Sequence, residues 1–218
     1  DTIENIEHLQ MGTGSDTVEG NIYDNTLKGG DGAGIDTLSF ANASNDITIN
    51  LSDNNGTSTG FGTDTFVGFE KFLGSAQNDT LKTNATDNIT FNGSQGIDTA
   101  DYTGMGAAAT VTVNNGNTSA TVASGGNTDT LEDVENIISG EGNDTFVVSD
   151  VTNIDTLDGG GGNNTLQLSG DQLDLSSVTL LNFDTIIVAN DDSLTLNAKD
   201  LSDKNMNITL NGTGSLII

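Results

Sequence analysis

The residues best suited to chemistry lie in a nine-residue stretch at positions 139–147, with the sequence S-G-E-G-N-D-T-F-V. Glycine occupies its second and fourth positions, Asp144 its sixth, and an apolar residue its eighth. Glycine adopts positive φ at little cost, so such a loop can turn backbone carbonyl groups inward. Carbonyl and carboxylate oxygens are the ligands that a hard cation such as calcium prefers. The stretch therefore predicts an oxygen-lined cation site followed by a short strand.

The same unit recurs in three clusters of three loops each. The clusters begin at Met11, Gly74 and Ser139. One such loop could arise by chance in a chain with 28 glycines, but three clusters with similar internal spacing are strong evidence of a repeat. The sixth positions hold Asp16, Asn25 and Asp36 in the first cluster, Asp79, Asn88 and Asp98 in the second, and Asp144, Asp155 and Asn164 in the third.

A longer repeat encloses these clusters. Acidic and apolar segments that start at Asp1, Asp64 and Asp129 each lead, 15 residues later, into the first Asp of a cluster. A fixed repeat of this kind predicts stacked units, each too small to bury a core without its neighbours.

The pattern Gly-Gly-x-Gly-x-Asp-x-apolar-x resembles the calcium-binding repeat of RTX (repeats-in-toxin) proteins, over about three quarters of the chain. The resemblance implies an all-β fold, a right-handed parallel β-roll or β-solenoid built from nonapeptide calcium loops with strand inserts. It also implies that every second loop lies on the same edge, with calcium between neighbouring loops. The implied neighbours are Asp16 with Asp36, Asp79 with Asp98, and Asp144 with Asn164.

The candidate Ca²⁺ ligands that the resemblance implies are the loop glycines and the sixth-position residues. The middle loops, which end at Asn25, Asn88 and Asp155, lack most of the glycines, so plain β-turns stabilised by Asn and Asp remain an alternative there. The full candidate set is Gly12, Gly14, Asp16, Gly32, Gly34, Asp36, Asp79, Gly96, Asp98, Gly140, Gly142, Asp144, Asp155, Gly160, Gly162 and Asn164.

We expect one domain over residues 1–218, in which residues 1–167 form three repeat segments and residues 168–218 form metal-poor coils or a cap. Alternation of apolar and polar residues predicts strands near 46–51 and 109–113. Turns are expected at 53–56 and 114–116. In the last part of the chain we expect strands at 193–196 and 207–210 and a single helical turn within 198–204.

The composition narrows the classes of partner. The formal net charge is −27, with only five Lys and Arg residues, which disfavours binding to nucleic acid or to an anionic membrane surface. Without an added cation, this charge should also oppose the compact state. There is no cysteine, hence no disulfide or thiolate metal site, and no apolar run that could span a bilayer. Because the chain begins inside a repeat, we expect it to be a piece of a longer protein.

The sequence offers little for catalysis. Residues 56–60 match the Gly-x-Ser-x-Gly form of a nucleophile elbow, which requires a preceding strand, a following helix and a later His. The single histidine of the chain, His8, lies upstream of that motif. We therefore expect a protein that is not an enzyme.

The functional expectation follows from the resemblance. It implies a calcium-dependent structural module of a secreted bacterial cell-surface protein, an S-layer protein or an RTX adhesin exported by type I secretion, which folds outside the cell when calcium binds. Its partners would be further copies or neighbouring domains of the same surface protein. The alternative is the C-terminal export and folding domain of a secreted enzyme or toxin, which an upstream catalytic or pore-forming domain would indicate.

Overall fold

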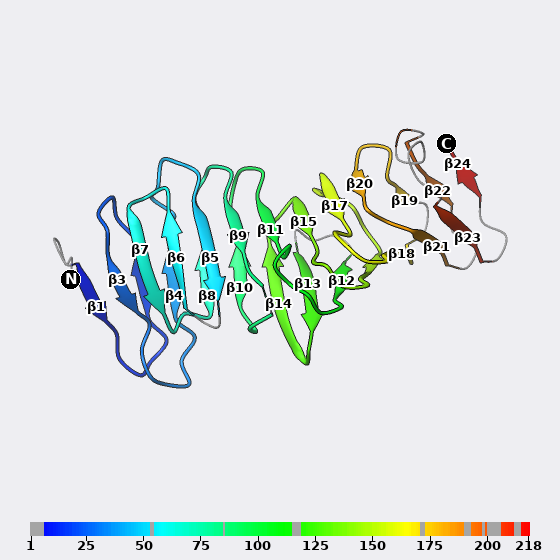
Figure 1. The fold of residues 1–218 in the computed structure, drawn as a ribbon. Coiled ribbons are helices and arrows are strands. Elements are labelled where there is room, and N and C mark those ends of the chain that lie inside the picture. Colours follow the sequence, from blue (N-terminus) through cyan, green and yellow to red (C-terminus); the bar gives the residue numbers. More distant parts are fainter. Residues whose placement is uncertain are drawn as a thin grey trace.

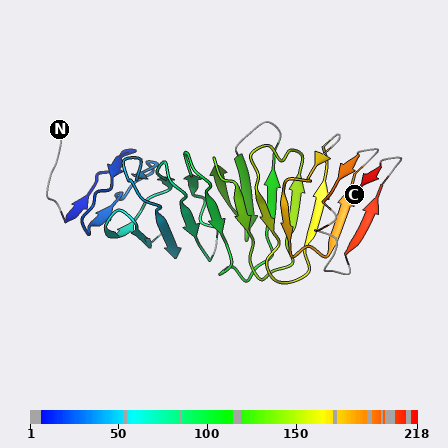
Figure 2. The same cartoon turned by 90° about the horizontal axis from the view of Figure 1, so that it is seen from above.

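The computed structural model describes residues 7–52, 55–84, 86–114, 119–170, 173–189, 193–197, 199, 206–211 and 215–218. These residues form an elongated body with its first and last strands near opposite tips and short strands that cross the long axis (Figures 1 and 2). The expected helical turn at 198–204 lies outside the described residues except for Lys199, as do parts of the expected turns at 53–56 and 114–116.

One long sheet, here called sheet A, contains ten strands. In spatial order they are β1 (His8–Gln10), β3 (Thr26–Lys28), β7 (Thr63–Val67), β6 (Asn55–Thr59), β5 (Thr48–Ser52), β9 (Thr80–Lys82), β11 (Thr99–Asp101), β15 (Asn136–Ile138), β17 (Thr156–Asp158) and β20 (Thr179–Leu181).

The second long sheet, sheet B, contains eleven strands, and a short sheet C lies near the C-terminus. Sheet B consists of β2 (Thr17–Glu19), β4 (Thr37–Ser39), β8 (Lys71–Leu73), β10 (Thr90–Asn92), β14 (Asn127–Glu132), β13 (Ser119–Ser124), β12 (Thr110–Val113), β16 (Thr145–Val148), β18 (Thr165–Leu168), β21 (Thr185–Val188) and β23 (Asn207–Leu210). Sheet C consists of β19 (Leu173–Asp174), β22 (Leu194–Thr195) and β24 (Leu216–Ile217).

Most neighbouring strands are parallel, and two hairpin inserts interrupt this pattern. In sheet A, β6 pairs antiparallel with both β5 and β7. In sheet B, β13 pairs antiparallel with both β12 and β14. Outside these inserts the chain alternates between the sheets, so that β2 pairs with β4 and β9 with β11 in parallel register.

The core lies between sheets A and B and is built from the middle residue of the short strands. Leu81 of β9 and Phe91 of β10 are fully buried, while their strand neighbours are more exposed. Phe66 of sheet A contacts Phe72 of sheet B, with ring centroids 5.3 Å apart. Because each fully buried apolar side chain contributes about 1.5–3 kcal/mol, a one-residue-deep row along each sheet supports a thin, elongated body.

Several expectations about the fold are confirmed. The chain is all-β, with parallel and antiparallel pairs in its sheets and no helix among the described elements. The strands expected near 46–51, 109–113, 193–196 and 207–210 appear as β5, β12, β22 and β23. The Gly-x-Ser-x-Gly motif runs through β6, an antiparallel strand followed by β7, and therefore lacks the helix that a nucleophile elbow needs. Among the described residues, no helix has the length and apolarity to cross a lipid bilayer.

Candidate metal centre

The loop residues that precede the parallel strands form two rows, one along each long sheet. Within a row, the backbone N–H of one loop residue donates a hydrogen bond to the side chain at the same position in the next loop. We call each such bond a rung, and the two rows ladder A and ladder B after their sheets. Rungs of this kind align the acidic side chains of successive loops along one edge of the sheet.

Ladder B begins in the first cluster. The N–H of Asp16 donates to Oδ1 of Asp36 at 2.8 Å, and the N–H of Asp36 donates to Oε2 of Glu70 at 2.9 Å. The side chain of Asp36 is 5% exposed. The expected juxtaposition of Asp16 and Asp36 is thus present in the structure.

Ladder A carries the second cluster. Oδ1 of Asp79 accepts from the N–H of Ile47 at 2.7 Å, and the N–H of Asp79 donates to Oδ1 of Asp98 at 2.6 Å. The N–H of Asp98 then donates to Oε2 of Glu135 at 2.7 Å. Asp79 and Asp98 are both buried, so this segment of the ladder places two adjacent carboxyl groups out of water.

The third cluster continues on ladder B, beyond the second hairpin insert. The N–H of Ala109 donates to Oδ1 of Asp144 at 2.7 Å, and the N–H of Asp144 donates to Oδ1 of Asn164 at 2.9 Å. The N–H of Asn164 donates to Oδ2 of Asp184 at 2.8 Å. Each of the three expected neighbour pairs is therefore brought together by a rung.

Sequence reasoning missed the acids that close these rungs, Glu70, Glu135 and Asp184. They occupy the acidic position of the apolar-acid-x-apolar segment in the longer repeat, as in Phe69-Glu70-Lys71-Phe72. The signal was therefore present in the longer repeat. A search confined to the glycine-rich loops does not reach it.

Asp64 and Asp129, also missed, end ladder segments beside the hairpin inserts. Asp64 accepts from the N–H of Asn25 at 3.0 Å and from the hydroxyl of Ser58 at 2.9 Å. Asp129 accepts from the N–H of Asp87 at 3.0 Å and from the hydroxyl of Tyr102 at 3.0 Å. Next to each of these two acids' strands, the sheet continues with an antiparallel strand, which interrupts the ladder. The next ladder segment begins at Ile47 in ladder A and at Ala109 in ladder B.

The candidate glycines lie where successive loops approach most closely. A Cβ on Gly34 would collide with the carbonyl oxygen of Gly14, and one on Gly162 with that of Gly142. Similar overlaps bring Gly32 against Thr13, Gly96 against Gln77, Gly160 against Gly140, Gly140 against Met105, and Gly142 against Ala107. A Cβ on Gly12 would lie at ordinary contact distance, 4.0 Å, from Asp16 Oδ2, and Gly14 has open space at the Cβ position. The carbonyl oxygens of each loop thus face the loop that stacks on it.

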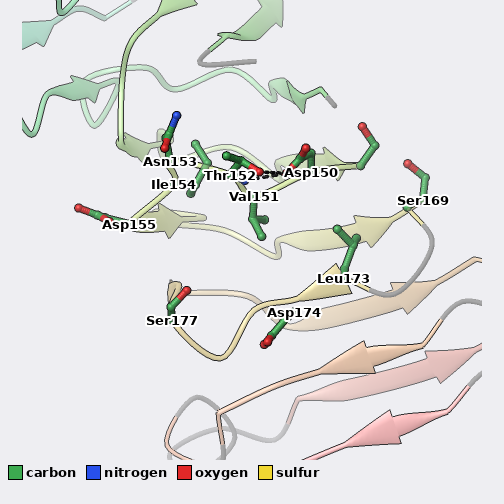
Figure 3. A pocket seen from close by; sticks show the side chains of 12 residues that line it. Asp150, Val151, Thr152, Asn153, Ile154, Asp155, Ser169, Leu173, Asp174 and Ser177 are labelled. Carbon is green, nitrogen blue, oxygen red and sulfur yellow. Dashed lines mark hydrogen bonds between the residues drawn. The ribbon is translucent and has the colours of Figure 1, made fainter. Parts of the chain in front are cut away.

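Asp155 departs from the other candidates. Its side chain is exposed, and its backbone N–H donates to the carbonyl oxygen of Glu135 at 2.9 Å instead of to a side chain. It lines an open groove of about 820 Å³, shown in Figure 3, whose walls carry mainly hydroxyl and carboxyl groups. The groove lies between residues 149–155 and residues 169, 170, 173, 174 and 177.

Burial changes the pKa values of several carboxyl groups in the ladders. Removal from water raises the pKa values of Asp64, Asp79, Asp129 and Glu135 above their ordinary range, although hydrogen bonds to each carboxylate oppose the rise. For Asp98, burial followed by the nearby charges of Asp79, Glu135 and Asp133 raises the pKa to about 7. Bringing carboxylates into a dry interior therefore disfavours their charged form, and a bound cation would counter this.

The residues of the ladders fit a calcium ion in donor chemistry. Each carboxylate oxygen has two lone pairs, so one accepted hydrogen bond leaves capacity for a cation. Oδ2 of Asp98 is buried and has no hydrogen-bond partner, which is a site where a positive charge would be stabilising. Among the described residues, no three His, Cys, Asp or Glu side chains form a group that could hold a metal ion. A calcium site here would therefore draw several of its ligands from backbone carbonyl groups.

Comparison with known proteins adds no homologue. No protein-family model matches the chain, and neither a curated protein nor a solved structure matches it significantly. The functional argument therefore depends on this chain's own residues.

Proposed function

We propose that this chain is a calcium-stabilised structural module of a secreted bacterial cell-surface protein, folded as a parallel β-roll or β-solenoid and without catalytic activity. The observation that carries the proposal is the alignment of acid-bearing loops into two ladders. Glu70, Glu135 and Asp184 of the longer repeat extend the rungs of the glycine-rich loops. A repeat that places acids of successive loops next to one another gains stability from a bound hard cation.

Magnitudes support a folding role for the cation. A ligand that binds only the folded state adds about 2.7 kcal/mol per site at a hundredfold excess over its Kd. Two or three such sites approach the whole stability of an ordinary domain, about 5–15 kcal/mol. With a formal charge of −27, the calcium-free chain also repels itself. Low calcium would thus keep the chain unfolded inside the cell, and higher calcium would fold it outside.

Within this proposal the ladder acids have assigned roles. Asp16 with Asp36, Asp79 with Asp98, and Asp144 with Asn164 would supply side-chain oxygens, and the facing loop glycines would supply carbonyl oxygens. The bound calcium would supply positive charge between stacked loops. The module would contact further copies or neighbouring domains of the same surface protein.

Circular dichroism of the purified chain, in chelator and in millimolar calcium, tests the proposal. We expect a β-sheet signal in calcium and its loss in chelator, with recovery when calcium is restored. Potassium chloride at equal ionic strength is the control, because screening alone should not refold the chain if specific sites are needed. The same β-sheet signal in chelator and in calcium would contradict the proposal.

A further inference from the structure

One of the five basic side chains of this acidic chain extends across sheet B. Strands β8, β10 and β14 are neighbours in that order. Lys71 of β8 lies opposite Thr90 of β10. Asn92, at the end of β10, lies opposite Glu132 of β14. Nζ of Lys71 nevertheless lies 3.6 Å from Oε2 of Glu132, so the lysine side chain extends over β10, diagonally toward Asn92.

Lys71, Asn92 and Glu132 share the outer face of sheet B, because successive side chains of a strand point to opposite faces. The residues next to them in the three strands are buried in the core: Phe72, Phe91 and Leu131. Nδ2 of Asn92 donates to Oε2 of Glu132 at 3.0 Å. One carboxylate oxygen therefore contacts both the amine nitrogen of a lysine and the amide nitrogen of an asparagine.

The lysine interrupts a row of threonines on this face. In the parallel register of sheet B, the position of Lys71 is held in the neighbouring strands by Thr17, Thr37, Thr90 and Thr130. The side chains of Lys71 and Glu132 are 37% and 35% exposed. An ion pair between side chains this exposed adds little to stability. Charge pairing alone therefore gives little reason for a lysine at this position.

We propose that Lys71 and Asn92 become joined by an intramolecular amide bond, with Glu132 as the group that moves the proton. The carboxylate of Glu132 accepts a proton from Nζ of Lys71, and the neutral amine attacks Cγ of Asn92. A bond forms between Nζ and Cγ, and the bond between Cγ and Nδ2 breaks. Glu132 then gives the proton to Nδ2, and one molecule of ammonia leaves.

The fold supplies what this reaction needs. The reaction requires no oxidant or second reactant, because the amine, the amide and the carboxylate all belong to this chain. Holding the three groups on adjacent strands removes the entropy cost of bringing them together. Partial exposure of the site lets ammonia escape into solvent. The inference goes beyond the proposed function, because the bond itself involves no calcium.

A competing reaction of the same asparagine is disfavoured. Asn92 precedes Gly93, and the backbone nitrogen of a glycine in this position can attack Cγ of the asparagine and release ammonia by ring closure. Here the N–H of Gly93 donates to the carbonyl oxygen of Glu132 at 2.9 Å, which holds that nitrogen in the sheet. The amine of Lys71 is therefore the nucleophile available to Asn92.

Mass spectrometry of the full chain, folded in calcium, tests the proposal. We expect a mass below that of the sequence by one molecule of ammonia. Trypsin should cleave after Lys82 but not after Lys71, and should leave residues 29–82 bonded to residues 83–199. The thermal midpoint should be higher than that of Lys71→Arg, because a covalent cross-link restricts the unfolded chain.

Two variants on the outer face, Lys71→Arg and Glu132→Gln, are the controls, and circular dichroism checks that each is folded. Lys71→Arg keeps the positive charge without the amine, and Glu132→Gln keeps the size of the side chain without the proton acceptor. Neither variant should lose ammonia. If Glu132→Gln loses ammonia as the unmodified chain does, the role of Glu132 is wrong.

The remaining outcomes separate this inference from the proposed function. The full sequence mass together with cleavage after Lys71 would overturn the cross-link. Loss of ammonia from Lys71→Arg would also overturn it, because the ammonia would then come from ring closure at Gly93. If the unmodified chain folds equally well in chelator, the proposed function fails, while the mass and the tryptic peptides still test the bond.

Discussion

The first and second clusters form the same rung from different loops. Asp16 donates to Asp36 within loops rich in glycine, whereas Asp79 donates to Asp98 although the loop at 74–79 has glycine only at its first position. The second pair is the more buried, at 1% exposure for both residues. In that loop the hydroxyl group of Ser75 donates a hydrogen bond to Asp79 Oδ1 at 3.1 Å, which glycine cannot supply. The comparison shows that the sixth-position side chain and the parallel register form the rung, while glycine sets how closely the loops stack.

The largest expected change in the free energy of unfolding comes from removing one rung side chain from each of these two clusters. Asp79→Ala leaves the N–H of Ile47 and both donors of Ser75 without their acceptor, so we expect a loss of about 3–5 kcal/mol in the free energy of unfolding. Asp36→Ala removes the acceptor of a single N–H, that of Asp16, and should cost about 1–3 kcal/mol. Urea denaturation in saturating calcium measures both, and equal losses would contradict the comparison.

A smaller effect should distinguish two glycines at the same loop position in the first cluster. Gly34→Ala places a methyl group against the carbonyl oxygen of Gly14, so we expect a loss of about 1–3 kcal/mol from overpacking. Gly14→Ala is the matched control, because no atom lies within 4 Å of its added Cβ. Thermal denaturation in calcium should show a lower midpoint for the first variant only. A similar decrease in both would mean that stacking does not determine the role of these glycines.

The smallest expected effect is a pH dependence from the ladder ends. Burial raises the pKa values of Asp64 and Asp129, and the nearby carboxyl groups of Asp24 and Asp87 add to the rise. A raised pKa in the folded state means that these groups favour folding below their unfolded pKa, near 3.8, and that this contribution is lost as pH rises through the folded values. The contribution of these two groups to stability should therefore decrease as pH rises above about 4.

The matched control for that measurement is the double variant Asp64→Asn and Asp129→Asn. Repulsion among the other carboxylates also lowers stability as pH rises. The unmodified chain alone therefore does not separate the contribution of Asp64 and Asp129 from that repulsion. The double variant should show a shallower decrease in unfolding free energy with pH. An unchanged slope would assign the pH dependence to the remaining charges.

The all-β fold class could be predicted from the sequence because it follows from local periodicity, and the resemblance to the RTX repeat implied the three neighbour pairs. Threonine begins many of the short strands, and the buried residue follows it, as in Thr80-Leu81 and Thr90-Phe91. The return strand β6 was missed because residues 55–59 are polar and lack an apolar alternation, although Ser58 is buried against Asp64. Residues 55–59 form a strand because they pair with β5 on one side and with β7 on the other.

The missed site residues have a related explanation. Glu135 approaches Asp98 from 37 positions along the chain, and nothing in a nine-residue window indicates that distance. The unpartnered oxygen of Asp98 depends on the folded surroundings of that side chain, which no local sequence pattern gives. Side chains that act between repeats are thus harder to find from sequence than those that act within one.

The two hairpin inserts have a consequence for curvature. The first adds its returning strand, β6, to sheet A, and the second adds β13 to sheet B. Each insert places three strands where the regular alternation has one, so it lengthens one face by two strand spacings, about 10 Å, relative to the other, which would bend the body toward the shorter face. Placing the second insert on the opposite face restores equal lengths, so the long axis can stay straight over many levels.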